Sequence, residues 1–144
     1  MMPLYMLDTN VVSQMMREPM STATQQIARL TAQDEGCNMA ISSVVLCELR
    51  FGLQRKPNAR LERALQAILP TLNVAALDAD VAPYYASLRT ALEQCGAPMS
   101  PNDTLIAAHA LALDATLVSA DAAFARVPGL RLENWFDTPA PPLS

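Results

Sequence analysis

The sequence is poor in several residue types on which common enzyme sites depend. Its 144 residues include four glycines, one histidine, His109, and one lysine, Lys56. So few glycines leave little room for a glycine-rich phosphate-binding loop, and no G-x-S-x-G nucleophile motif is present. A single histidine excludes the acid–base pair of histidines that metal-free ribonucleases commonly use. A dehalogenase-like site is disfavoured too, because Asn10 stands where its second acid would follow Asp8. A receiver-like site would need an early acidic pair and a lysine after a late strand, and Lys56 is the only lysine.

Cysteines are also few, and long apolar segments are absent. Cys37, Cys47 and Cys95 are odd in number and far apart, which disfavours a disulfide framework or a zinc site and predicts buried thiols. No apolar run reaches the roughly 18 residues that a membrane-spanning helix requires. The first ten residues have neither the basic region nor the small-residue cleavage site of a signal peptide. We therefore expect a cytoplasmic protein without a membrane span.

Charged residues make up only 17% of the chain, and the net charge is −4. With 51% hydrophobic residues, this composition predicts a globular chain. It also argues against a uniformly basic surface for nucleic acid. The one concentration of cationic side chains consists of Arg50, Arg55, Lys56, Arg60 and Arg63. We expect these side chains to contact RNA phosphates, and a solvated helical hairpin is the alternative.

Short apolar segments alternate with helical patterns along the chain. Strands are expected at residues 5–7, 39–41, 72–75, 116–118 and 131–133. Helices are expected from about residue 11, over 21–31, from the cap at 42–43 to 56, and over 59–69, 78–95 and 101–113. Because parallel strands need long crossovers, this order predicts an α/β fold: a three-layer α/β/α sandwich around a parallel sheet. Residues 1–136 are expected to form one domain, and the Pro-rich residues 137–144 a flexible tail.

Four acidic residues occupy positions where such a sheet binds ligands. Asp8 and Asp121 follow predicted strands, Asp103 lies in the first turn of a helix, and Glu48 lies less than two turns into another. Ligands of open parallel sheets bind beyond the carboxyl ends of the strands, so these four acids could converge. Converging carboxylates must be protonated or neutralised by a cation, and all-oxygen ligation favours Mg²⁺ or Mn²⁺. Such an ion supports phosphodiester hydrolysis.

Each of the four acids also has an ordinary structural explanation. Asp8 and Asp121 could cap the helical segments that follow them. Asp103 could complement a helix dipole, and Glu48 could be an exposed helix position. The apolar neighbours of Glu48 favour a buried ligand instead, because the charge interrupts a segment typical of a core.

His109 and the methionines at 15, 16 and 20 are interpreted structurally. His109 lies in an apolar helical pattern, which favours a role in the core. Met15, Met16 and Met20 could form an adaptable partner surface, but core packing is the favoured interpretation.

Four segments of the chain resemble the PIN-domain toxins of VapBC toxin–antitoxin modules, in the order in which that family has them. They are MLDTN at 6–10, ISSVVLCELRFG at 41–52, GAPMSPNDTLIAAHAL at 96–111 and LVSADAAFARVPGLRLENW at 117–135. The resemblance implies a PIN fold and an Mg²⁺- or Mn²⁺-dependent endoribonuclease that cleaves structured RNA and inhibits translation. It also implies a VapB-like antitoxin and a homodimer. It places the catalytic and metal-binding acids on Asp8, Glu48, Asp103 and Asp121, with Ser119 and Asn10 in support.

The segment from SPND to AAHA resembles the subgroup that cuts initiator tRNA in its anticodon loop, so that tRNA is the expected substrate. Val45 stands where the family often has threonine, which removes a hydroxyl and no ligand. Two other functions stay open. One is a catalytically silent PIN-fold binding module held by an antitoxin, which would be expected to lack one of the acids. The other is a structure-specific DNA nuclease, for whose clamping elements this chain has no room.

Overall fold

The computed structural model describes residues 3–34 and 37–136. The tail expected at residues 137–144 lies outside this range. Five parallel strands form one sheet in the order β3-β2-β1-β4-β5. The strands are β1 (Leu4–Leu7), β2 (Asn38–Ser42), β3 (Asn73–Ala75), β4 (Thr116–Val118) and β5 (Arg131–Glu133). The predicted strands therefore all exist, and the first strand of the chain lies at the centre of the sheet.

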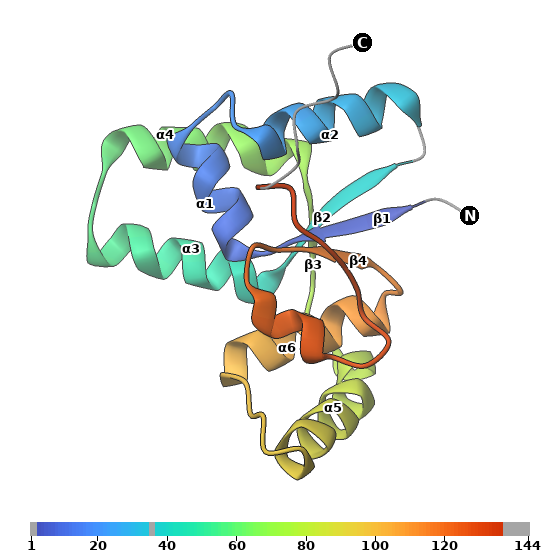
Figure 1. The fold of residues 1–144 in the computed structure, drawn as a ribbon. Helices are drawn as coiled ribbons and strands as arrows, with labels where there is room; N and C mark the ends of the chain where they lie inside the picture. The colour runs from blue at the N-terminus through green and yellow to red at the C-terminus, as the bar shows by residue number, and fades with distance from the viewer. Residues whose placement is uncertain (1–2, 35–36, 137–144) are drawn as a thin grey trace.

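Helices cover both faces of the sheet, which confirms the predicted three-layer α/β/α sandwich (Figure 1). Helix α1 packs against α2, α3 and α4, while α6 packs against α5 and α3. The α-helices are α1 (Thr9–Arg17), α2 (Thr22–Gln33), α3 (Ser43–Arg55), α4 (Ala59–Ile68), α5 (Ala82–Gln94) and α6 (Pro101–Ala112). Short 3-10 helices are η1 (Leu69–Thr71), η2 (Ala79–Val81) and η3 (Ala122–Arg126).

Capping residues set the helix boundaries much as predicted. Ser100 accepts a hydrogen bond from the backbone of Asp103, and Pro101 occupies the first turn of α6. Ser42 caps α3 by accepting from the backbone N–H of Val44. Two predictions were less accurate. Helix α1 begins at Thr9 instead of near residue 11, and the long helix predicted from residue 78 is divided into η2 and α5.

The core prediction holds for some sulfur-containing side chains and is wrong for others. Met15 and Met16 are buried, whereas Met20 is 78% exposed. Cys47 and Cys95 are exposed, so the prediction of buried thiols is wrong for them, and all three cysteines are free. Cys47 lies on the solvent side of α3, where preceding apolar residues do not imply burial because adjacent helical residues face different directions. Cys95 lies just after the end of α5, between Gln94 and Gly96. Along residues 3–34 and 37–136, no helix combines the length and apolar character needed to cross a bilayer.

Leu65 on α4 offers a test of the packing between α4 and the body of the domain. Its side chain is fully buried in the main hydrophobic core, whereas Leu113, just after α6, is 40% exposed. Leu65→Ala is expected to lower the free energy of unfolding by about 2–5 kcal/mol, because it removes buried methyl groups and leaves a cavity. Leu113→Ala serves as the control and should change that free energy by no more than about 0.5 kcal/mol. Urea unfolding measures both, and equal losses would contradict the packing described.

Candidate functional site

The four acids are held by elements that meet at the carboxyl end of the parallel sheet. Asp8 directly follows β1, and Asp121 follows β4, its neighbour in the sheet. Asp103 lies in the first turn of α6, and Glu48 lies in α3, which begins directly after β2. Figure 1 shows the starts of α1 and α3 at this end of the sheet. The topology thus brings residues from four separate parts of the chain to one edge, as the sequence predicts.

Asp8 is the most buried of the four acids, with 5% of its surface exposed. It occupies the N-cap position of α1, yet its side chain makes no capping hydrogen bond. Instead, its Oδ2 accepts hydrogen bonds from Ser119 Oγ at 2.7 Å and from Asn10 Nδ2 at 3.3 Å. The capping explanation therefore does not account for the orientation of this carboxylate.

The pKa of Asp8 is raised above its usual value, chiefly because burial disfavours the charged form. The hydrogen bonds from Ser119 and the Thr9 backbone oppose this change, while the negative charges of Asp103 and Glu48 add to it. Asp103 and Glu48 therefore both lie within electrostatic range of Asp8.

Asn10 and Ser119, the two predicted supporting residues, form a network around Asp8. Asn10 Nδ2 also donates to Ser119 Oγ at 3.3 Å, and Asn10 Oδ1 accepts from the backbone N–H of Ala120 at 3.3 Å. Ser119 Oγ accepts from the backbone N–H of Asp121 at 3.0 Å. These contacts fix the carboxyl end of β4 against the start of α1 and restrict the Asp8 side chain to one orientation.

Thr9 holds Glu48 and was not identified from the sequence. Its Oγ1 donates a hydrogen bond of 2.9 Å to Glu48 Oε1, which joins α1 to α3 across 39 positions of the chain. Glu48 is half-buried, while the neighbouring Cys47 faces solvent. The only sequence signal for this role is a hydroxyl directly after Asp8, and it says nothing about the distant acid that the hydroxyl meets.

Asp103 and Asp121 differ in their surroundings. Asp103 is half-buried, and its pKa is raised first by burial and then by the negative charge of Asp121, against a lowering by its hydrogen bond with Ser100. Asp121 is exposed, and its Oδ1 accepts from the backbone N–H of Ala123 at 2.9 Å at the start of η3. The capping explanation is therefore correct for one oxygen of Asp121, which nevertheless lies within electrostatic range of Asp103.

The donor set at this edge suits a hard divalent cation, because it consists of carboxylate and hydroxyl oxygens. Burial and mutual repulsion raise the pKa of Asp8 and of Asp103, and a bound cation would relieve both effects. Within the described part of the chain, no three His, Cys, Asp or Glu side chains already stand close enough to enclose an ion. The acids therefore share one edge without forming a closed ligand set.

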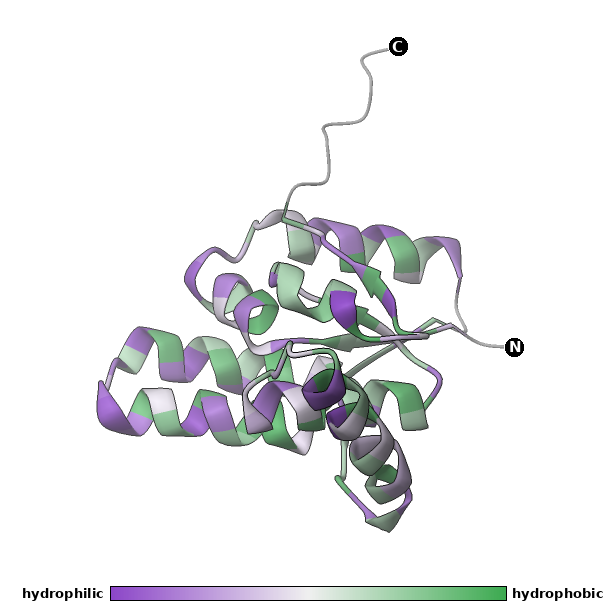
Figure 2. Cartoon of the chain, turned by 60° about the horizontal axis from the view of Figure 1, so that its bottom comes forward, coloured by the Kyte–Doolittle hydropathy of each residue, from purple (hydrophilic) through white to green (hydrophobic). Residues whose placement is uncertain are grey.

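The predicted cationic residues lie on the hairpin formed by α3 and α4, whose outer end is strongly hydrophilic (Figure 2). All five side chains are exposed. Arg50 forms a 2.7 Å ion pair with Glu62, and the Arg55 guanidinium lies 5.5 Å from the centre of the Phe51 ring. Arg60 approaches the carbonyl of Arg17 at 3.5 Å. The charge of Arg50 is thus partly neutralised within the hairpin.

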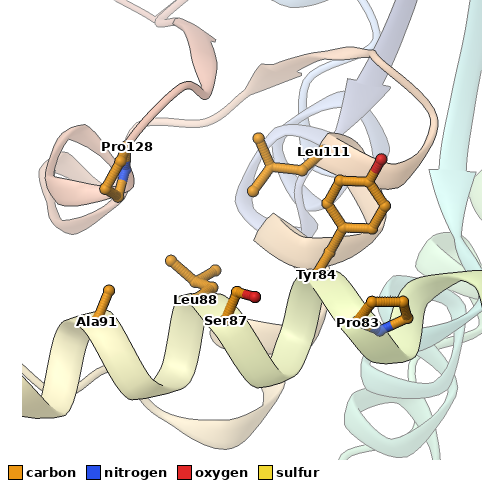
Figure 3. A pocket seen from close by; sticks show the side chains of 7 residues that line it. All are labelled: Pro83, Tyr84, Ser87, Leu88, Ala91, Leu111 and Pro128. Carbon is orange, nitrogen blue, oxygen red and sulfur yellow. The ribbon is translucent and has the colours of Figure 1, made fainter.

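An open apolar cavity of about 470 Å³ lies apart from the four acids (Figure 3). Side chains of α5 face Leu111 of α6 and Pro128 across it, and Tyr84 is 45% exposed at its edge. None of the four acids lines it, and Leu111 lies eight residues, or about 12 Å of helix, beyond Asp103. Its lining residues include no carboxylate, so this cavity cannot supply the ligands proposed for a cation.

Comparison with known proteins gives consistent matches over nearly the whole chain. The PIN domain family matches residues 5–130. A protein named Ribonuclease VapC2 from Rickettsia felis is 37% identical over 134 residues, which cover 92% of this chain and 98% of the relative. A tRNA(fMet)-specific endonuclease VapC from Salmonella typhimurium is 32% identical over 100 residues, covering 67% of this chain and 75% of the relative.

The fold agrees with these sequence matches. The crystal structure of VapBC2 from Rickettsia felis, bound to a DNA fragment from its promoter, contains a chain that superimposes with a TM-score of 0.84 at 37% identity. That match covers 92% of this chain and 98% of the other. The chain therefore belongs to the PIN domain family and, within it, to the VapC group.

Proposed function

We propose that the protein is a metal-dependent endoribonuclease, the toxin of a toxin–antitoxin pair. The observation that carries the proposal is the buried Asp8 carboxylate, which faces the charges of Asp103 and Glu48 at the carboxyl edge of the sheet. Buried carboxylate charges that no cation neutralises destabilise the folded protein. The site therefore suits a bound cation better than a purely structural role. The named ribonuclease relatives support the same conclusion.

Asp8, Glu48, Asp103 and Asp121 would hold Mg²⁺ or Mn²⁺. When bound, such an ion activates water and offsets the negative charge that develops on a phosphodiester during hydrolysis. The other residues of the site orient these carboxylates. Ser119 and Asn10 fix Asp8 by hydrogen bonds at 2.7 and 3.3 Å, and Thr9 fixes Glu48 at 2.9 Å. Because each of these donors binds a single carboxylate oxygen, lone pairs remain for a cation.

The proposed substrate is structured RNA in the cytoplasm, with initiator tRNA as the specific candidate and inhibition of translation as the result. One relative, 32% identical, is named as a tRNA(fMet)-specific endonuclease. The relative with 37% identity is named only as a ribonuclease, so ribosomal RNA stays an alternative substrate.

The proposed protein partner is a VapB-like antitoxin. The neighbour with a TM-score of 0.84 comes from a VapBC2 complex, and the likeness extends over 92% of this chain, so the same kind of complex can be expected here. Homodimerisation stays a prediction from the family resemblance. A catalytically silent binding module is the alternative function, but no member of the acidic set is missing, which favours the enzyme.

Asp8→Asn separates catalysis from folding. Cleavage of RNA is expected to fall by at least about 100-fold, equivalent to about 3 kcal/mol of activation free energy. Folding raises the pKa of Asp8, so ionised Asp8 lowers the free energy of unfolding at pH values above its usual pKa. An uncharged amide removes this cost, and the melting temperature in EDTA is expected to rise by a few degrees. The exposed Asp80→Asn is the control and should change neither quantity; unchanged cleavage by Asp8→Asn would refute the site.

Metal dependence can be tested with purified total tRNA and ribosomal RNA. The wild-type protein, free of antitoxin, should give discrete fragments in Mg²⁺ or Mn²⁺ and none in EDTA. Asp103→Asn should give none in any of these conditions, because it removes one of the charges proposed to hold the ion. Sequencing of the fragment ends identifies the RNA. An intact RNA pool after incubation with the wild-type protein would favour the silent binding module.

Arg55 and Arg60 test whether the α3–α4 hairpin contacts RNA. Binding is measured with the inactive Asp103→Asn protein, so that the RNA stays intact. Arg55→Ala and Arg60→Ala should weaken binding and flatten the dependence of log K on log salt by about 0.7–0.9 per lost phosphate contact. The control is Arg131→Ala, which removes another exposed arginine, paired with Asp114 at the other end of the strands. Equal salt slopes for all the proteins would favour the solvated hairpin.

A further inference from the structure

A buried polar pair lies outside the four acids. His109 on α6 is 1% exposed and Ser42 at the end of β2 is fully buried, and His109 Nδ1 lies 2.8 Å from Ser42 Oγ. The two residues are 67 positions apart. A buried hydrogen bond between distant elements restricts how those elements can move, because breaking it leaves two polar groups without water.

The hydrogen-bonding partners determine the direction of this bond. Ser42 Oγ already accepts from the backbone N–H of Val44 at 3.1 Å, so its own proton is available for the ring. Burial lowers the pKa of His109, against raising effects from the charge of Asp78 and the backbone of Ala76. Burial therefore favours the neutral ring, and the contacts of Ser42 favour the tautomer in which Nδ1 accepts the Ser42 proton and Nε2 carries the ring hydrogen.

These contacts fix the first turn of α3 at two points. Ser42 is the N-cap of α3, so the His109 bond attaches the start of this helix to α6. Beside it, Ser43 Oγ accepts from the backbone N–H of Leu77 at 3.1 Å, which attaches the same turn to the segment after β3. The start of α3 is therefore held from both sides.

The helix attached in this way carries Glu48, and its partner α6 carries Asp103. Glu48 lies five residues after the first residue of α3, about 7.5 Å along the helix axis. A tilt of about 10° at the helix start would move the backbone of Glu48 by about 1.3 Å, and errors of about 1 Å in a reacting site can cost about 100-fold in rate. A contact at the start of α3 therefore affects the position of Glu48, a proposed metal ligand.

We propose that His109 is a positioning residue that, through Ser42, holds α3 against α6 and so sets the spacing of Glu48 and Asp103 for a divalent cation. The inference rests on the proposed function, because it assumes that these two acids share a cation. If His109 only filled space in the core, the volume of its ring alone would matter. In the proposed role, its hydrogen bond with Ser42 also determines the affinity for the ion.

The test compares two substitutions of His109 by calorimetric titration of each folded, antitoxin-free protein with MgCl₂. His109→Leu keeps most of the volume and removes the acceptor. His109→Asn is smaller but keeps an oxygen near the position of Nδ1. The Leu variant is expected to bind Mg²⁺ about 10-fold more weakly, the lower range for loss of an outer-shell contact, and the Asn variant should recover most of the affinity. The fully buried Leu65→Ala is the control for lost stability and should bind Mg²⁺ like the wild type.

A second pair of variants covers the case in which His109→Leu does not fold. Ser42→Ala removes the hydroxyl from the other side, and Ser21→Ala removes the comparable N-cap of α2, which lies away from the acids. The proposal is supported if Ser42→Ala binds Mg²⁺ more weakly than the wild type while Ser21→Ala binds it equally well. Equal affinities in wild type, Ser42→Ala and any folded His109→Leu overturn it, as does an Asn variant no better than Leu. If the wild type itself binds no Mg²⁺, the proposed function fails first, and the inference fails with it.

Discussion

The burial of negative charge at the carboxyl edge of the sheet is the constraint on which the rest of the site depends. Burial is the main reason that the pKa of Asp8 rises, and the negative charges of Asp103 and Glu48 add to the rise. Such an arrangement opposes folding, so the surrounding structure must hold it in place. The apolar contacts of the central strands, together with donors from Ser119, Asn10 and Thr9, provide this support. The site is thus a region of local instability within a well-packed sheet.

Much of the fold could be predicted because its signals are local. Strands β4 and β5 have the predicted bounds, and the Ser-Pro-Asn-Asp start of α6 forms the predicted cap. The positions of Asp8 and Asp121 after strands also predicted the shared edge, because parallel strands bring their carboxyl ends together. That the acids at this edge are catalytic and bind metal stays a prediction.

The features that the sequence did not reveal depend on direction around a helix or on contacts between distant residues. Cys47 follows the apolar residues Val45 and Leu46 yet faces solvent, and Met20 lies beyond the last buried turn of α1. The bonds from Thr9 to Glu48 and from Ser42 to His109 join residues 39 and 67 positions apart. Such pairings follow from how helices pack on the sheet, and no spacing within one segment encodes them.

The hydrogen bond between Ser119 and Asp8 also has a consequence for biosynthesis. It joins residues 111 positions apart, and the strands that carry them pair side by side at the centre of the sheet. In a chain growing from its N-terminus, Asp8 is made 111 residues before Ser119, the residue that donates to it. Because the central pairing has this high contact order, the edge cannot assemble on a shorter nascent chain. The topology itself therefore delays the completed site until the residues of β4 and Ser119 have been made.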